Sequence, residues 1–193
     1  MANSAAVVRG RHMQTFLQQI DTLPDGDRTA IRQALSPSTL ERIEGVSSVD
    51  WVPVAMNLEV TRVVSVQLGS ARAPQFFRDF LLAGFATPIL HAFVTGAVRL
   101  AGSDPGAAFK WIPTGYGLIF RDCGVWATRD RTSSSMAIEV TSLPVLMRDP
   151  IWVTSVAGSF GAIFDLTQKQ GTVVVESFDV GAGTVVFRAR WQP

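Results

Sequence analysis

Two histidines, His12 and His91, are the residues of this 193-residue chain best suited to bind a metal or transfer a proton near neutral pH. His91 lies within residues 88–93, where mostly apolar neighbours and helical spacing predict an apolar helix. An imidazole on such a helix could ligate haem iron, although an imidazole alone does not make a haem site. The alternative is a core histidine that hydrogen bonds to a nearby carbonyl. We expect the core role for His91 and keep haem ligation as an alternative.

The single cysteine, Cys123, excludes an intramolecular disulfide and any multi-cysteine metal site. Arg121 is two residues away on the same face of a predicted strand, and a nearby cation can lower the pKa of a thiol enough to make it reactive. A free cysteine is more often a small buried apolar residue. A reactive thiol is therefore the alternative for Cys123, and burial is the expectation.

Other segments resemble catalytic motifs only superficially. Gly158-Ser159-Phe160-Gly161 lacks the Gly-x-Ser-x-Gly spacing of a nucleophile elbow, and Ser159 falls inside a predicted helix. Residues 113–117 are glycine-rich but lack the lysine and spacing of a phosphate-binding loop. No cluster of histidine, cysteine and carboxylate residues has metal-ligand spacing. We expect neither an enzyme nor a metal site.

Composition limits the classes of partner. The chain is 47% hydrophobic and 17% charged, with a net charge of +1 and no concentrated run of basic residues. Nucleic-acid binding requires such a basic surface, so we expect none. The longest apolar region, residues 76–100, is interrupted by charged residues, glycine and proline, whereas a membrane span needs about 18 nearly uncharged apolar residues. We expect a cytoplasmic protein whose apolar excess either forms a large core or meets a partner. We also expect the protein to self-associate through apolar helices.

Helical spacing dominates the first part of the chain. The predicted helices cover residues 11–20, 27–35, 38–43, about 51–68 and 74–101, with one further turn or two after Pro105. Gly69 is expected to end the fourth of these helices, and Gly84 and Pro88 to split or kink the fifth.

The pattern becomes β-like after Pro113. Strands are predicted at residues 116–128 and 135–142, followed by a helix at about 150–170 that Asp149 caps and a closing hairpin. Gly158 and Gly161 weaken that helix, which indicates that a backbone or a ligand approaches it closely. In the hairpin we expect Glu176 opposite Arg188, with Val173 and Val175 on the core face.

This order predicts an α+β fold in one domain, residues 1–193. N-terminal helices (about 1–113) pack on an antiparallel sheet of about four strands (about 114–193), with the 150–170 helix between the strand pairs.

Scattered segments carry a family resemblance. Arg9-Gly10, Trp51-Val52-Pro53, Gly158 with Gly161, and Phe187-Arg188-Ala189-Arg190-Trp191 resemble a family of small proteins found mainly in myxobacteria. That family is similar to a fold group comprising the haem–nitric-oxide sensor domain, the 4-vinyl reductase domain and the lipid-binding Golgi-tethering subunits. The resemblance implies a pocket between helices and sheet, and a sensor or scaffold role. It also implies acylation as a possible role for Cys123. The Tyr-x-Ser-x-Arg motif of the haem domain is absent from residues 119–124.

We therefore predict a non-enzymatic, homodimeric sensor or scaffold in bacterial signalling, without a cofactor, that binds a small apolar ligand between its layers. The predicted pocket residues are Phe76, Phe80, Phe93 and Trp111. The first alternative is a protein–protein scaffold without a ligand, and the second is a haem gas sensor that uses His91.

Overall fold

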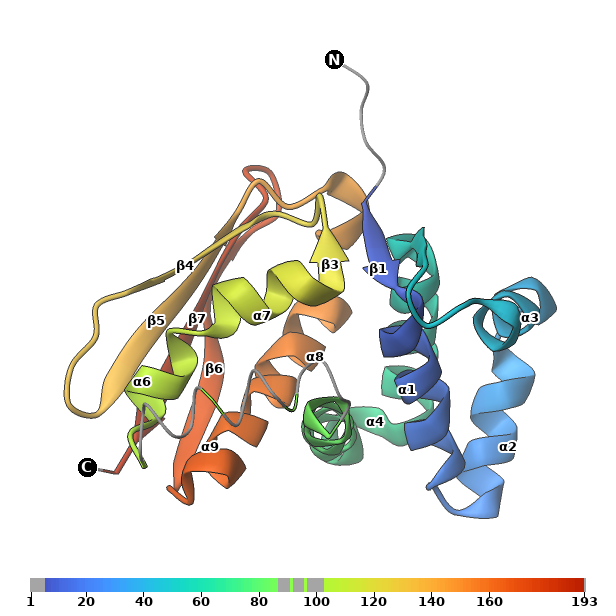
Figure 1. Ribbon diagram of the computed structural model, residues 1–193, viewed down its shortest axis with the longest axis horizontal. Helices are drawn as coiled ribbons and strands as arrows, with labels where there is room; N and C mark the ends of the chain where they lie inside the picture. The colour runs from blue at the N-terminus through green and yellow to red at the C-terminus, as the bar shows by residue number, and fades with distance from the viewer. Residues whose placement is uncertain (1–5, 87–90, 92–95, 97–102, 193) are drawn as a thin grey trace.

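The structure, a computed structural model, describes residues 6–86, 91, 96 and 103–192. N-terminal helices form one side of the molecule and a four-stranded sheet the other, with helix α8 (Pro150–Phe160) between them (Figure 1). Both sheets are antiparallel. The predicted α+β fold is confirmed.

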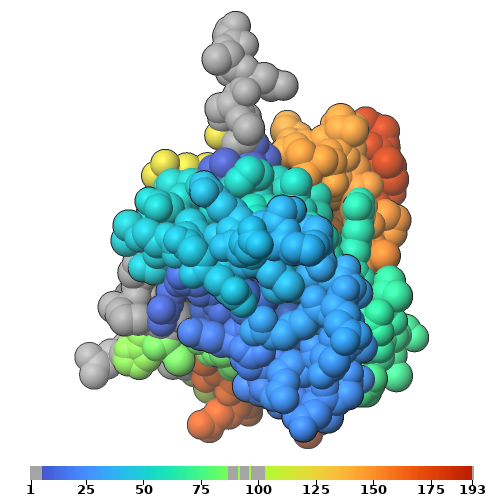
Figure 2. Space-filling view, turned by 90° about the vertical axis from the view of Figure 1, so that its right-hand side faces the viewer, coloured from blue at the N-terminus to red at the C-terminus, as the bar shows by residue number. Residues whose placement is uncertain are grey.

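Four helices build the N-terminal side: α1 (Gly10–Asp21), α2 (Asp25–Ala34), α3 (Pro37–Gly45) and α4 (Val54–Phe85). Seen from this side, the N-terminal residues cover most of the molecular face (Figure 2). Gly69 has a φ of 68° and a ψ of 174°, outside the helical region, so it ends the first helical part of α4 as predicted. A second helical part follows it and continues to Phe85. Glycine adopts this conformation without the steric cost that a side chain would add.

A small sheet joins three distant segments, β1 (Val7–Arg9), β2 (Trp51–Pro53) and β3 (Phe120–Arg121), in the order β2-β1-β3. One face of this sheet is buried, with Val8 and Val52 completely inaccessible. The larger sheet has the order β4-β5-β7-β6. Its strands are β4 (Val125–Arg129), β5 (Ser135–Thr141), β6 (Gly171–Asp179) and β7 (Thr184–Trp191).

The predicted strand at residues 116–128 is wrong over its first part. Two short helices, α6 (Pro105–Phe109) and α7 (Ile112–Ile119), precede β3, and α7 contains Tyr116. Pro113 lies in the first turn of α7, where proline favours a helix start. The Tyr116 ring stacks on Trp126, with 3.8 Å between ring centroids, which holds α7 against β4.

Helix α8 begins as predicted, because the Asp149 carboxylate accepts a hydrogen bond of 2.9 Å from the Ile151 N–H. The predicted helix at 150–170 is divided, however, since α8 ends at Phe160 and α9 covers Ala162–Thr167. A Cβ added to Gly158 would lie 3.1 Å from Pro74 Cα in α4. Backbone of α4 therefore approaches α8 closely at this glycine. A turn of 3-10 helix (Val145–Met147) precedes α8.

The closing hairpin confirms one predicted contact and corrects the register. Arg188 forms an ion pair with Glu176 at 2.8 Å, but the residue opposite Arg188 is Val174. A bulge between Val175 and Ser177 inserts an extra residue, which shifts the pairing beyond it. Val175 lies opposite Phe187, but Val175 is 36% exposed and Val173 is only half-buried, so the predicted core face of this strand is wrong: β6 is the edge strand of the sheet.

No helix within the described ranges has both the length and the apolar character that crossing a membrane requires.

Candidate functional site

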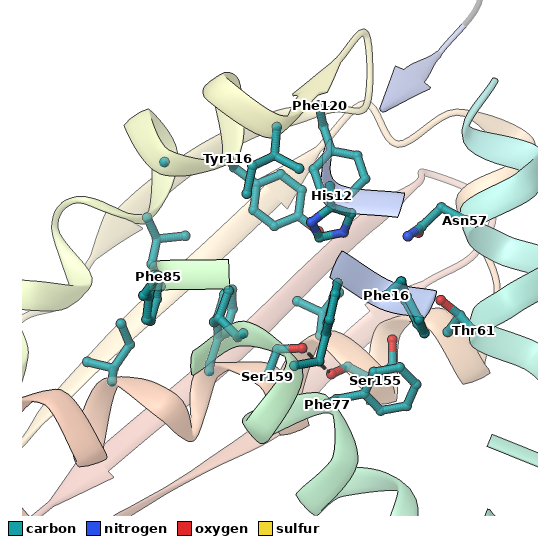
Figure 3. Close-up of a pocket in the computed structure, with 18 of the residues that line it drawn as sticks. His12, Phe16, Asn57, Thr61, Phe77, Phe85, Tyr116, Phe120, Ser155 and Ser159 are labelled. Carbon is teal, nitrogen blue, oxygen red and sulfur yellow. Dashed lines mark hydrogen bonds between the residues drawn. The ribbon is translucent and has the colours of Figure 1, made fainter. Parts of the chain in front are cut away.

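A cavity of about 110 Å³ lies between the N-terminal helices and α8. Its walls come from α1, α4, α6, α7, α8 and α9 (Figure 3). A single buried water needs only roughly 10–15 Å³, so this space can admit a larger group.

Aromatic rings form much of the cavity wall. Phe16 of α1 packs on Phe80 of α4 with 4.3 Å between centroids, and Phe77 lies 6.1 Å from Phe16. Phe85 and Phe160 add further apolar surface. Such a wall favours a ligand with an extended apolar body.

His12 is the histidine that lines this cavity. Its ring lies 4.8 Å from that of Phe80 and 5.2 Å from that of Phe120, and Figure 3 shows it between Phe120 and Asn57. Burial lowers the pKa of His12 from 6.5 to about 3, because the charged ring would lose its hydration. No residue in the described part of the chain hydrogen bonds to its ring nitrogens. The ring is therefore neutral and has a free lone pair beside the cavity.

The other polar groups of the lining carry no charge. Asn57 and Thr61 reach the cavity from α4, and Asn57 donates a weak hydrogen bond of 3.7 Å to Met13 Sδ. Ser155 and Ser159 reach it from α8, and both hydroxyls donate to backbone carbonyls of that helix. No lysine, arginine or carboxylate occurs among the described lining residues.

Tyr116 completes the polar part of the lining. Its ring stacks between Trp126 at 3.8 Å and Phe120 at 4.6 Å, and burial raises the pKa of its hydroxyl well above 10. The hydroxyl therefore stays protonated. Nε1 of Trp126, the residue on which Tyr116 stacks, is buried without a hydrogen-bond partner among the described residues.

The predicted pocket residues separate into three groups. Phe80 and Trp111 line the cavity. Phe76 is 4% exposed and packs against Phe16 and Phe77 within the core, outside the lining. The prediction that Phe76 lines the pocket is therefore corrected. Phe76 directly precedes the lining residue Phe77 in α4, but its own ring is enclosed by the core. Phe93 lies outside the described residues.

The two predicted reactive residues lie apart from the cavity. His91 is helical and exposed and does not line it, so the predicted core role is wrong, while haem ligation by His91 stays a prediction. Cys123 is 3% exposed, and its thiol donates to the Arg121 carbonyl at 3.1 Å. Burial raises the pKa of Cys123 to about 12, which keeps the thiol protonated and unreactive. The expected burial of Cys123 is confirmed, and the reactive-thiol alternative is wrong.

No pocket role was assigned to His12 or Tyr116 from the sequence. A signal for His12 does exist, because His12 and Phe16 are four residues apart and so lie on one face of a helix. That face carries apolar residues, and a histidine among them meets the protein interior. Tyr116 was hidden by its assignment to a strand.

The sequence matches no family model and no curated protein. The structure, however, matches solved structures of H-NOX proteins, the haem–nitric-oxide sensor domains. A mutant Fe(II) unliganded H-NOX protein from K. algicida has a TM-score of 0.65 at 11% identity, over 96% of this chain and 97% of that one. An oxygen complex of an H-NOX domain related to soluble guanylate cyclases has a TM-score of 0.61 at 10% identity, over 93% and 92%. A structure described as probing heme distortion in the H-NOX family gives 0.62 at 10% identity, over 96% and 95%.

The chain has the H-NOX fold. At 10–11% identity the likeness establishes the fold alone. The predicted similarity to the haem–nitric-oxide sensor fold is thereby confirmed, and the resemblance to the myxobacterial family stays a prediction.

The likeness also corrects the expectation that the protein carries no cofactor. The matched H-NOX structures include an Fe(II) unliganded protein, an oxygen complex and a structure that probes heme distortion. The described residues can be tested against such a group. His12 offers a neutral imidazole, the usual form of a histidine ligand to iron, beside an apolar wall that suits a porphyrin. The described lining thus offers a ligand for the iron and apolar contacts for a macrocycle. The cavity volume of about 110 Å³ is smaller than the roughly 300–1,000 Å³ of typical small-molecule pockets, and the described lining places no cation next to the propionate carboxylates.

Proposed function

We propose that this chain is a sensor domain that binds haem in the cavity between its layers, with a histidine as the iron ligand. The observation that carries the proposal is the neutral His12 ring, which lines an apolar cavity with no hydrogen-bond partner among the described residues. The H-NOX fold supports it. We further propose that the domain has no catalytic activity of its own.

The chain's own residues would have distinct roles toward such a cofactor. Burial keeps His12 uncharged and able to donate its lone pair. Phe16, Phe80 and Phe160 would exclude water from the faces of the macrocycle. Bound haem would supply an iron that takes diatomic gases, with an affinity that the polarity of the surrounding pocket adjusts.

Reconstitution with hemin tests the proposal. We expect the purified protein to bind hemin with saturation and to develop a Soret band. His12→Ala and His91→Ala then serve as controls for each other. Loss or displacement of the band in His12→Ala alone would assign His12 as the ligand, and the same effect in His91→Ala alone would assign His91. Failure of the wild-type protein to bind hemin, or unchanged spectra in both variants, would contradict the proposal.

The uncharged lining favours a second candidate, a largely apolar ligand without a formal charge. Haem propionates find no lysine or arginine among the described lining residues, whereas Asn57 and Thr61 can hydrogen bond to an uncharged polar group. Native mass spectrometry of protein purified without denaturant distinguishes the two. A retained organic molecule other than haem would favour this candidate, and a ligand-free mass together with no hemin binding would favour a scaffold. The same spectrum tests the predicted homodimer.

A further inference from the structure

The outer face of the three-stranded sheet carries an unusual group of side chains. Arg9 of β1, Trp51 of β2 and Arg121 of β3 lie together there, with Val49 and Leu118 beside them. We call these five residues the Arg–Trp surface. Its residues are not among those that line the cavity.

Trp51 contacts two guanidinium groups. Arg9 Cζ is 4.1 Å and Arg121 Cζ is 4.0 Å from the centroid of the indole ring. Stacking on an aromatic ring limits the motion of each planar guanidinium and leaves its edge free to donate hydrogen bonds.

These two arginines differ from most others in the chain. Eight arginines form ion pairs with carboxylates, whereas neither Arg9 nor Arg121 has such a pair among the described residues. Arg9 donates to the carbonyls of Val49 at 2.6 Å and Leu118 at 3.4 Å, which anchors it. The Arg121 side chain is exposed and donates no hydrogen bond to any described residue. Its guanidinium is therefore oriented by Trp51 and open to an anion.

Apolar side chains flank the cations. The side chains of Val49 and Leu118 are 63% and 38% exposed, respectively. Tryptophan and arginine are the residues most enriched at energetically dominant positions of protein interfaces. Together the five residues offer a preoriented cation next to apolar contact area.

We propose that the Arg–Trp surface binds a partner protein through a segment that carries a carboxylate beside an apolar side chain. Arg121 would hold the carboxylate through paired N–H donors, and Val49 and Leu118 would contact the apolar neighbour. Two arginines are too few for a membrane surface, which typically requires clusters of about 4–8 basic residues. They are also too few for the several phosphate contacts of a nucleic acid.

The test uses the full chain and a short synthetic peptide of leucine and glutamate, followed by NMR of the amide and indole resonances. We expect saturable binding that perturbs Trp51, Leu118 and Arg121. Arg121→Gln should weaken binding by about tenfold, the size expected for loss of one charge-assisted hydrogen-bonded pair. Arg190→Gln is the matched control, because Arg190 is an exposed arginine on the four-stranded sheet, and it should bind like the wild type.

Four outcomes would overturn the proposal. They are the absence of saturable binding, equal losses in Arg121→Gln and Arg190→Gln, undiminished binding of the same peptide with every glutamate replaced by glutamine, and binding to phosphatidylglycerol vesicles without binding to the peptide. The result does not depend on haem, since the surface and the cavity share no residue. Hemin binding and peptide binding can therefore fail independently.

Discussion

At the residue scale, burial among aromatic rings keeps the imidazole of His12 uncharged. The ring lies among Phe16, Phe80 and Phe120, and the surface that remains accessible faces the cavity. An imidazolium there would lose most of its hydration, so burial lowers the pKa of His12 to about 3. The neutral ring is the form that can bind a metal or accept a hydrogen bond from a ligand.

This burial predicts a specific pH dependence in the ligand-free protein. Between about pH 3 and 6.5 the unfolded chain binds a proton at His12 that the folded chain does not, so the free energy of unfolding falls as the pH is lowered through this window. The effect has an upper limit of about 1.4 kcal/mol per pH unit. His12→Gln should show a correspondingly shallower pH dependence in urea unfolding, whereas His91→Gln, at an exposed position, should resemble the wild type. Equal slopes in the wild type and His12→Gln would contradict the burial argument.

Among the elements, α8 connects the two sides of the molecule. Asp149 caps its N-terminus and also accepts from Arg62 of α4 at 2.6 Å, so one carboxylate stabilises both the helix start and its contact with α4. Near the other end of α8, Gly158 lets Pro74 of α4 approach to 3.1 Å from where a Cβ would stand. These two contacts help to fix the position of α8, and with it one wall of the cavity.

Gly158→Val should therefore destabilise the protein. The added side chain would meet backbone atoms of Pro74, which cannot rotate away, and overpacking of this kind costs about 1–3 kcal/mol. Gly26→Ala in α2 is the control, because nothing lies within 4 Å of its added Cβ, and removing a helical glycine should be neutral or stabilise by up to about 1 kcal/mol. Urea unfolding of both variants measures the difference. An unchanged stability in Gly158→Val would show that the α4–α8 approach is not a tight contact.

At the scale of the whole molecule, residues that line the cavity differ from core residues in their effect on stability. A core residue contributes to stability by filling space, whereas a pocket leaves space for a ligand at a cost in stability. Ser159 lines the cavity, and its hydroxyl donates only to the Ser155 carbonyl of its own helix. A larger apolar residue at this position would fill the space without leaving another side chain unpaired.

Ser159→Leu should raise stability and reduce ligand binding. Filling a cavity typically adds about 0.5–2 kcal/mol, and the filled space would exclude hemin or any other ligand. Thr154→Leu, on the exposed face of the same helix, should change neither property greatly. Thermal unfolding and hemin titration measure the two effects. Retained ligand affinity together with lower stability would show that the ligand binds elsewhere.

Short-range signals determined much of this structure. Asp149 and Pro150 predict the start of α8, and Gly69 marks the kink in α4. Caps, left-handed glycines and strand alternation act over a few residues, so the sequence by itself contains them. The α+β order of helices and strands follows from the same signals.

Only the tertiary structure decided which apolar residues face empty space. Phe76 and Phe80 are one turn apart in α4 and alike in type, yet only Phe80 lines the cavity, because packing by Phe16 and Phe77 encloses Phe76. Contacts between distant segments likewise brought Arg9, Trp51 and Arg121 together. Long-range packing depends on the relative placement of whole elements, which residue spacing along the chain does not specify.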